Sequence, residues 1–161
     1  MQGTHDTRLS RRHWLAAAAL TLPAVSTWAN RPEKPLVEMW KSATCGCCGE
    51  WAKHLEANGF RVQTTTVDNP SLVRARFGID HKLGSCHTAR VGGYVLEGHV
   101  PAKEIQRLLK EKPKDVLGIV VPGMPLGSPG MDSPSYGGKK TPYDVVVVRK
   151  DGRTGVYQSY R

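Results

Sequence analysis

The sequence predicts an α/β domain, and three observations carry that prediction. Segments with the apolar spacing of strands alternate along the chain with segments that have the spacing of amphipathic helices. Gly and Pro separate these segments and mark where helices start and stop. Three cysteines follow the first predicted strand directly, at Cys45, Cys47 and Cys48. We therefore expect a sheet covered by helices, with the cysteines at one of its edges.

The first half of the domain predicts two strand–helix pairs. Residues 36–41 have strand spacing and lead into the cysteine segment, and residues 49–58 predict a helix that Gly59 ends. Residues 61–67 are rich in Val and Thr and predict a second strand. A short helix should follow over residues 69–78, because Pro is favoured in a first helical turn. Strand, helix and strand together make a βαβ unit.

The second half predicts a hairpin followed by a helix. Residues 88–91 and 94–97 flank Gly92-Gly93, and Pro101 starts a helix that ends before Pro113. The order βα, βα, ββα, with Cys-x-x-Cys after the first strand, is typical of a thioredoxin-like core. In that topology the residues before the third strand face the first cysteines. The fourth cysteine, Cys86, should therefore meet the other three.

The C-terminal part predicts a long loop and a second hairpin. Residues 118–142 are rich in Pro and Gly, and an irregular loop of this length in a small domain is usually functional or disordered. Its prolines favour an ordered lid. Residues 143–149 and 154–160 flank Asp151-Gly152 and predict a β-hairpin that extends or covers the sheet.

The first 29 residues predict an export signal. Arg11-Arg12 precede an apolar run from Leu15 to Val25, which is too short to span a bilayer and resembles a twin-arginine signal. The mature chain, residues 30–161, should be a single periplasmic metal-binding domain without stable membrane insertion. This segment carries three of the 23 Lys and Arg and one of the 14 Asp and Glu, so the mature part keeps a formal charge of +7. Its basic residues are scattered, which argues against a nucleic-acid partner.

The four cysteines predict chemistry rather than a disulfide framework. Three of them lie within four positions, so no pairing gives well-spaced bridges, and three neighbouring thiolates repel one another. Such a group fits a soft metal ion or a disulfide in exchange. Cys48 should point toward the core, and Cys45 should lie ahead of the first helical turn, where the helix dipole favours a thiolate. Cys45 and Cys48 are therefore the expected catalytic or ligand pair, and loop geometry decides whether Cys47 joins them.

Histidines and methionines offer further ligands for a soft ion. His99 and Met124 are candidates, with His87 and Met131 ranked below them, and His54 and His81 are interpreted as surface residues. A segment that is extended through Cys86 would turn His87 to the opposite side. Thiolates and thioethers select Cu(I), and zinc is the closest rival. With three or four thiolates meeting, more than one copper ion could be bridged between sulfurs.

Four motifs in order resemble one known family. They begin at Thr44, Ser85, Gly92 and Val121, and read TCGCCGxW, SCHTA, GGYxxEGHVP and VPGMPxGSPGM. Together they are similar to the family filed as domain of unknown function DUF411, whose better-known members are the CopG-type periplasmic copper-resistance proteins. The resemblance covers roughly residues 36–160. It implies a thioredoxin-like fold and copper bound by Cys45, Cys47, Cys48 and Cys86, with His99 and Met124 in neighbouring motifs.

The resemblance also implies a role in copper handling or in interconverting Cu(I) and Cu(II), a possible copper oxidoreductase activity. Other periplasmic copper-handling proteins would then be partners. Two alternatives stay open. One is a thiol-disulfide oxidoreductase in which Cys45 attacks and Cys48 resolves, and the other is a copper chaperone or buffer without turnover.

Overall fold

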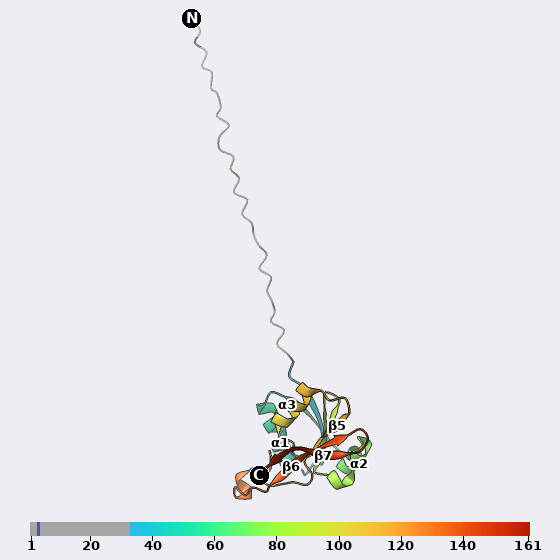
Figure 1. The fold of residues 1–161 in the computed structure, drawn as a ribbon. Helices are drawn as coiled ribbons and strands as arrows, with labels where there is room; N and C mark the ends of the chain where they lie inside the picture. The colour runs from blue at the N-terminus through green and yellow to red at the C-terminus, as the bar shows by residue number, and fades with distance from the viewer. Residues whose placement is uncertain (1–2, 4–32) are drawn as a thin grey trace. The chain divides into compact units, whose positions relative to one another are not determined.

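Seven strands form one mixed sheet in the computed structural model, which describes Gly3 and residues 33–161. The expected export signal therefore lies outside the described residues. Three α-helices and two short 3-10 helices complete this part of the chain (Figure 1). In chain order the elements are β1 (Leu36–Lys41), α1 (Gly46–Ala57), β2 (Arg61–Thr66), α2 (Pro70–Arg76), η1 (His81–Leu83), β3 (His87–Val91), β4 (Tyr94–Glu97), α3 (Ala102–Glu111), β5 (Val116–Val120), η2 (Pro134–Tyr136), β6 (Tyr143–Arg149) and β7 (Thr154–Tyr160).

The strands lie in the order β2-β1-β3-β4-β5-β6-β7. The pairs β1–β2 and β4–β5 are parallel, and the other four neighbouring pairs are antiparallel. β1 and β3 are antiparallel neighbours, with Lys41 opposite His87. The carboxyl end of β1, which leads to the first three cysteines, therefore lies beside the start of β3, which follows Cys86. This register joins two segments that are about 40 residues apart in the sequence.

Alternating side chains give the sheet two apolar faces. Met39 and Leu96 belong to the larger core cluster, together with residues of α1 and α3, whereas Val95 belongs to a second cluster with Ile79 and Phe77 of the α2 region. This is the period-two pattern of strands buried on both sides. In Figure 1, α1 and α3 lie next to each other and α2 lies apart from them. Helices thus cover both faces of the sheet.

Most of the predicted elements are confirmed, and two are corrected. The helix expected from Gly49 begins at Gly46, so Cys47 and Cys48 lie inside α1 and Cys45 is its N-cap. The segment expected to be irregular from Gly118 onward begins with β5, a strand between β4 and β6. An added Cβ on Gly118 would lie 1.9 Å from the Val95 carbonyl oxygen, so the close approach of β4 requires glycine there. None of the described helices is long and apolar enough to cross a membrane.

Candidate metal centre

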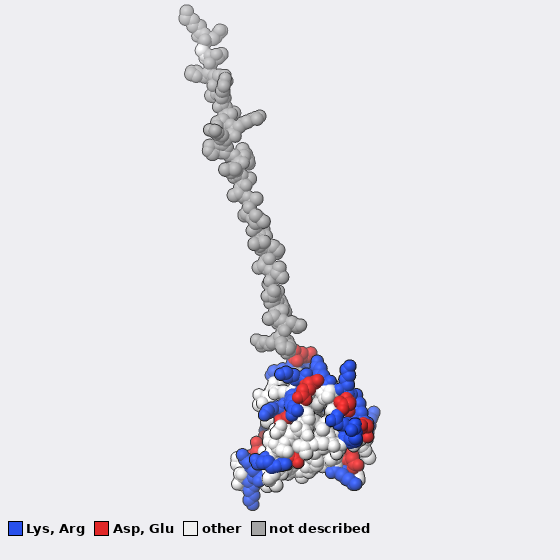
Figure 2. Space-filling view, in the orientation of Figure 1, with Lys and Arg blue, Asp and Glu red and all other residues white. Residues whose placement is uncertain are grey.

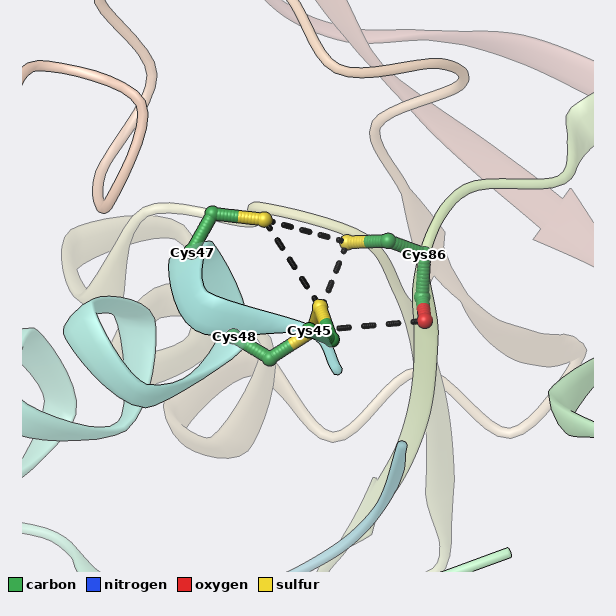
Figure 3. Close-up of side chains that lie close together, drawn as sticks. All are labelled: Cys45, Cys47, Cys48 and Cys86. Carbon is green, nitrogen blue, oxygen red and sulfur yellow. Dashed lines mark hydrogen bonds between the residues drawn. A yellow bond between two sulfur atoms is a disulfide. The ribbon is translucent and has the colours of Figure 1, made fainter. Parts of the chain in front are cut away.

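The four cysteines converge at the N-terminus of α1 (Figure 3). Their sulfur atoms all lie within 4.8 Å of one another, so one ion or a small group of ions could contact all of them. Cys48 is fully buried and the other three cysteines are partly exposed. The structure thus brings together Cys45, Cys47, Cys48 and Cys86, the four residues that the sequence analysis selected.

Cys45 and Cys48 form a disulfide in the structure, and Cys47 and Cys86 are free thiols. The Sγ atom of Cys47 lies 3.7 Å from that of Cys45 and 4.0 Å from that of Cys86. The Sγ atoms of Cys48 and Cys86 are 3.6 Å apart. In Figure 3 the free thiols point toward each other beside the disulfide. Cys47, whose participation depended on the loop, therefore belongs to the group.

Local sequence explains why the first three thiols gather. The backbone N–H of Cys45 donates to the Ser42 carbonyl, and Lys41 Nζ donates to the carbonyls of Ser42 and Cys45 at 3.1 and 3.4 Å. These bonds turn the chain between β1 and α1. Cys48 then lies one turn before Trp51, and both side chains are fully buried in the core.

Two histidines lie against Cys86. Its Sγ atom is 3.3 Å from Nδ1 of His87 and 3.1 Å from Nε2 of His99. Cys86, His87 and His99 form a second group whose ligand atoms lie within 4.8 Å of one another. His87 does not turn away from Cys86, as strand alternation suggested, because β3 begins only at His87 and the chain is not extended through Cys86. His87 is thus a stronger candidate ligand than strand alternation suggests, and the adjacent Cys-His pair in the sequence is the signal for it.

The contacts of His99 fix which of its ring nitrogens carries the proton. Nδ1 lies 2.8 Å from the Pro129 carbonyl oxygen, which can only accept a hydrogen bond. In the neutral ring Nδ1 therefore holds the hydrogen, and the lone pair of Nε2 faces Cys86. Such an outer hydrogen bond orients the histidine ligands of metal sites.

Burial sets the protonation states around the cysteines. It raises the pKa of Cys86 to about 12, and the neighbouring Cys47 adds to this effect. Burial also lowers the pKa of His87 well below its ordinary value, as the nearby His99 does to a smaller extent. The pKa of His99 is lowered by burial, while its bond to Pro129 opposes the shift. Without a bound cation, the site thus favours a neutral thiol at Cys86 and neutral imidazoles.

The Pro- and Gly-rich segment packs against α1, and its two methionines differ in solvent exposure. An added Cβ on Gly130 would lie 2.7 Å from the backbone nitrogen of Trp51 and 2.8 Å from the Cys47 carbonyl oxygen. Met131 is buried, whereas Met124 is 52% exposed. Met124 follows Gly123, whose N–H donates to the Gly84 carbonyl at 2.9 Å. The segment is thus bonded to the turn before Cys86, and ligation by Met124 stays a prediction.

His54 and His81 have different surroundings. His81 is exposed and lies 3.1 Å from Asp80, as expected of a surface residue. His54 is half-buried, and its Nε2 accepts the Ala102 N–H at 3.1 Å. The prediction of an ordinary surface role for His54 is wrong. The Ala102 N–H lies in the first turn of α3 and has no acceptor within the helix, and His54 supplies that acceptor from α1.

Comparisons with known proteins agree with these motifs. A family model described as "Protein of unknown function, DUF411" matches residues 83–131, which include Cys86 and His99. Two solved structures, forms 2 and 1 of "Copper resistance protein copG", are each 41% identical to this chain and cover 80% of it. The chain covers 100% and 98% of them, with TM-scores of 0.74 and 0.73. No curated protein matches. The chain therefore belongs to the CopG-type DUF411 family.

Proposed function

We propose that this chain is a periplasmic copper-binding protein of copper resistance or homeostasis, which holds copper through Cys45, Cys47, Cys48 and Cys86. The observation that carries the proposal is the mutual approach of these four sulfurs within 4.8 Å, from two distant segments. The similarity to structures titled copper resistance protein supports the choice of metal. Copper would then be the cargo or substrate of the protein rather than a resident cofactor.

The donor set fits copper well. Thiolate sulfur prefers Cu(I), and imidazole nitrogen accepts copper in either oxidation state. His99 offers its Nε2 lone pair next to Cys86, and we include it with Met124 among the ligands. Zinc could use the same donors, but a structural zinc site usually presents two paired ligand knuckles. In this chain three thiols crowd into one turn, which suits copper ions bridged by shared sulfurs.

The disulfide supports a redox role. Formation of the Cys45–Cys48 disulfide from two thiols releases two electrons and two protons. Those electrons reduce two Cu(II) ions to Cu(I), so atoms and charge balance at two copper ions per disulfide. An external dithiol would return the disulfide to thiols. In this direction the protein would act as a Cu(II) reductase. The reverse step, in which two Cu(I) ions give two electrons to the disulfide and two protons are taken up, would complete an interconversion of Cu(I) and Cu(II).

The same disulfide favours a second candidate, thiol-disulfide exchange with protein partners. Cys45 is the N-cap of α1 and partly exposed, and Cys48 is buried behind it. An exposed attacking cysteine and a buried resolving cysteine suit this chemistry. Cys47 and Cys86 argue against it as the main function, because exchange requires only two cysteines.

The architecture and charge are consistent with this assignment. The strand order β2-β1-β3-β4, with β3 antiparallel to β1 and α1 and α3 on one face, supports a thioredoxin-like core that β5, β6 and β7 extend. On the face drawn in Figure 2, Lys and Arg are interspersed with Asp and Glu, which suits a solvated surface better than a nucleic-acid interface. Residues 1–29 would be the twin-arginine export signal and residues 30–161 the mature domain. Partners would be other periplasmic copper-handling proteins.

Copper binding is tested on residues 30–161, reduced and metal-free, by anaerobic titration with Cu(I) against a competing chelator. We expect tight binding of at least one copper ion with loss of free thiols. Cys45→Ser or Cys86→Ser should sharply lower copper content while the far-ultraviolet circular dichroism stays the same. His81→Ala, at an exposed position, is the control. Unchanged copper content in both cysteine variants would contradict the proposal.

Turnover is tested by adding Cu(II) to the reduced protein in the presence of a Cu(I)-specific dye. We expect two Cu(I) ions for each Cys45–Cys48 disulfide, located by peptide mass spectrometry. Cys48→Ser should abolish this stoichiometry. Copper binding without Cu(I) release or disulfide formation would instead identify a chaperone or buffer. Disulfide exchange with a protein substrate, together with copper affinity no higher than that for zinc, would favour the second candidate.

A further inference from the structure

The turn before β3, residues 84–86, is bonded to a buried ion pair from two other elements. Arg74 of α2 places Nε 2.7 Å from Oε1 of Glu97 in β4, and their side chains are only 10% and 0% exposed. The same Oε1 accepts the Ser85 N–H at 2.7 Å, and Arg74 Nη2 donates to the Ser85 carbonyl at 2.8 Å. Both backbone polar groups of the residue before Cys86 are therefore bonded to this ion pair.

The turn also packs closely against both partners. An added Cβ on Gly84 would lie 2.5 Å from Nη1 of Arg74, so the backbone rests directly on the guanidinium group. The other carboxylate oxygen of Glu97, Oε2, accepts the Thr88 hydroxyl at 2.6 Å at the start of β3. The glutamate thus bonds to the chain on both sides of Cys86. This arrangement leaves the turn little freedom to move.

The position of Cys86 depends on this turn. Residues 84–86 belong to no helix or strand, so no ladder of backbone hydrogen bonds holds them. Yet Cys86 Sγ lies 3.6 Å from the Sγ of Cys48 and 4.0 Å from that of Cys47. The Ser85 hydroxyl also donates to the Gly123 carbonyl, next to Met124. A shift of the turn would therefore move a thiol and a candidate thioether together.

We propose that the Arg74–Glu97 ion pair is a positioning unit for the thiol site, which fixes the 84–86 turn and so holds Cys86 within metal-bridging reach of Cys47 and Cys48. Its bearing on copper rests on the proposed function, whereas its effect on the turn does not. An apolar pair could fill the same space with similar stability. Only the ion pair, however, supplies both an acceptor and a donor to the backbone of Ser85.

The test replaces the pair with apolar residues, Arg74→Met with Glu97→Leu. The matched control is Arg107→Met with Glu111→Leu, which removes an exposed ion pair on α3 with a distance of 2.8 Å. Trypsin releases Cys86 alone, in residues 83–90, and the other three cysteines together, in residues 42–53. Alkylation of the reduced, metal-free protein, read by mass spectrometry, therefore reports on Cys86 separately. Hydrogen exchange over residues 83–90 and Cu(I) affinity complete the measurement.

We expect the Arg74–Glu97 double variant to alkylate at least 10-fold faster at Cys86 relative to residues 42–53, and to exchange faster over residues 83–90. Its Cu(I) affinity should fall about 10- to 100-fold, the range found when residues that orient a metal ligand from outside its coordination sphere are changed. The α3 control should match wild type in all three measurements. Leu108→Ala, in the buried core, should lower stability without changing the alkylation ratio.

The proposal is overturned if the folded double variant matches wild type in Cys86 alkylation and exchange. Should the double variant not fold, Arg74→Lys decides the matter, because it keeps a charge for Glu97 but replaces with a single nitrogen the two guanidinium nitrogens that bond Glu97 and the Ser85 carbonyl. Faster alkylation at Cys86 supports the proposal, and an unchanged rate overturns it. If wild type binds no Cu(I), the proposed function fails, while alkylation and exchange still test the positioning role.

Discussion

Gly130→Ala tests the contact between the Pro- and Gly-rich segment and the first two turns of α1. Gly130 has φ +83°, and its added Cβ would lie 2.7 Å from the Trp51 nitrogen and 2.8 Å from the Cys47 carbonyl oxygen. The left-handed backbone conformation costs an L-residue about 1–2 kcal/mol, and overpacking costs about 1–3 kcal/mol. We expect the free energy of unfolding of the reduced, metal-free protein to fall by about 2–5 kcal/mol, measured in urea.

Gly152→Ala provides the matched control. Gly152 has φ +84°, and nothing lies within 4 Å of its added Cβ, so only the backbone cost of about 1–2 kcal/mol applies. The difference between the two variants isolates the contact with α1. If the segment instead lifts off α1, the bond from His99 to Pro129 should break and Cys47 should alkylate faster. Equal losses of stability in the two variants, with unchanged Cys47 alkylation, would refute the reasoning.

Three further predictions concern single side chains. Trp51→Phe removes the 2.8 Å hydrogen bond from Nε1 to the Val100 carbonyl. The free energy of unfolding should fall by about 1–3 kcal/mol, measured in urea. An unchanged urea midpoint would show that the carbonyl finds another donor. With its pKa raised to about 12, Cys86 should alkylate far more slowly than Cys47 at pH 8, and comparable rates would contradict the effect of burial. His87 has a folded-state pKa well below 6.5, so the unfolded chain binds more protons, and metal-free protein should lose stability as pH falls below about 6.5. Urea unfolding at pH 7.5 and 5.5 measures this loss, which His87→Gln should reduce; an identical loss in that variant would exclude His87 as its source.

Local signals in the sequence determined most of the secondary structure. The predicted bounds agree with the observed ones for four strands, β1, β4, β6 and β7. Strand alternation and turn glycines are local signals, so they can be read from a few neighbouring residues without knowledge of the fold. The helix α1 starts three residues before the predicted position, because Cys is not a residue type that marks an N-cap in a sequence, and Cys45 makes no side-chain capping bond. The predicted loop wrongly includes residues 118–120, the second half of β5, because a strand buried on both faces lacks alternation. Val116-Leu117 and Ile119-Val120 were its signal.

The sequence by itself selected the cysteines, since three thiols in four positions are informative wherever the chain folds. Only the tertiary structure decided their partners. The approach of His99 to Cys86, the bond from Ala102 to His54 at the start of α3, and the Arg74–Glu97 pair against the turn all depend on contacts between segments that are separated in the sequence. Periodicity describes which face of an element is apolar, but not which polar group it meets there. Those pairings arise from sheet register and helix packing, which are established only when the whole domain is folded.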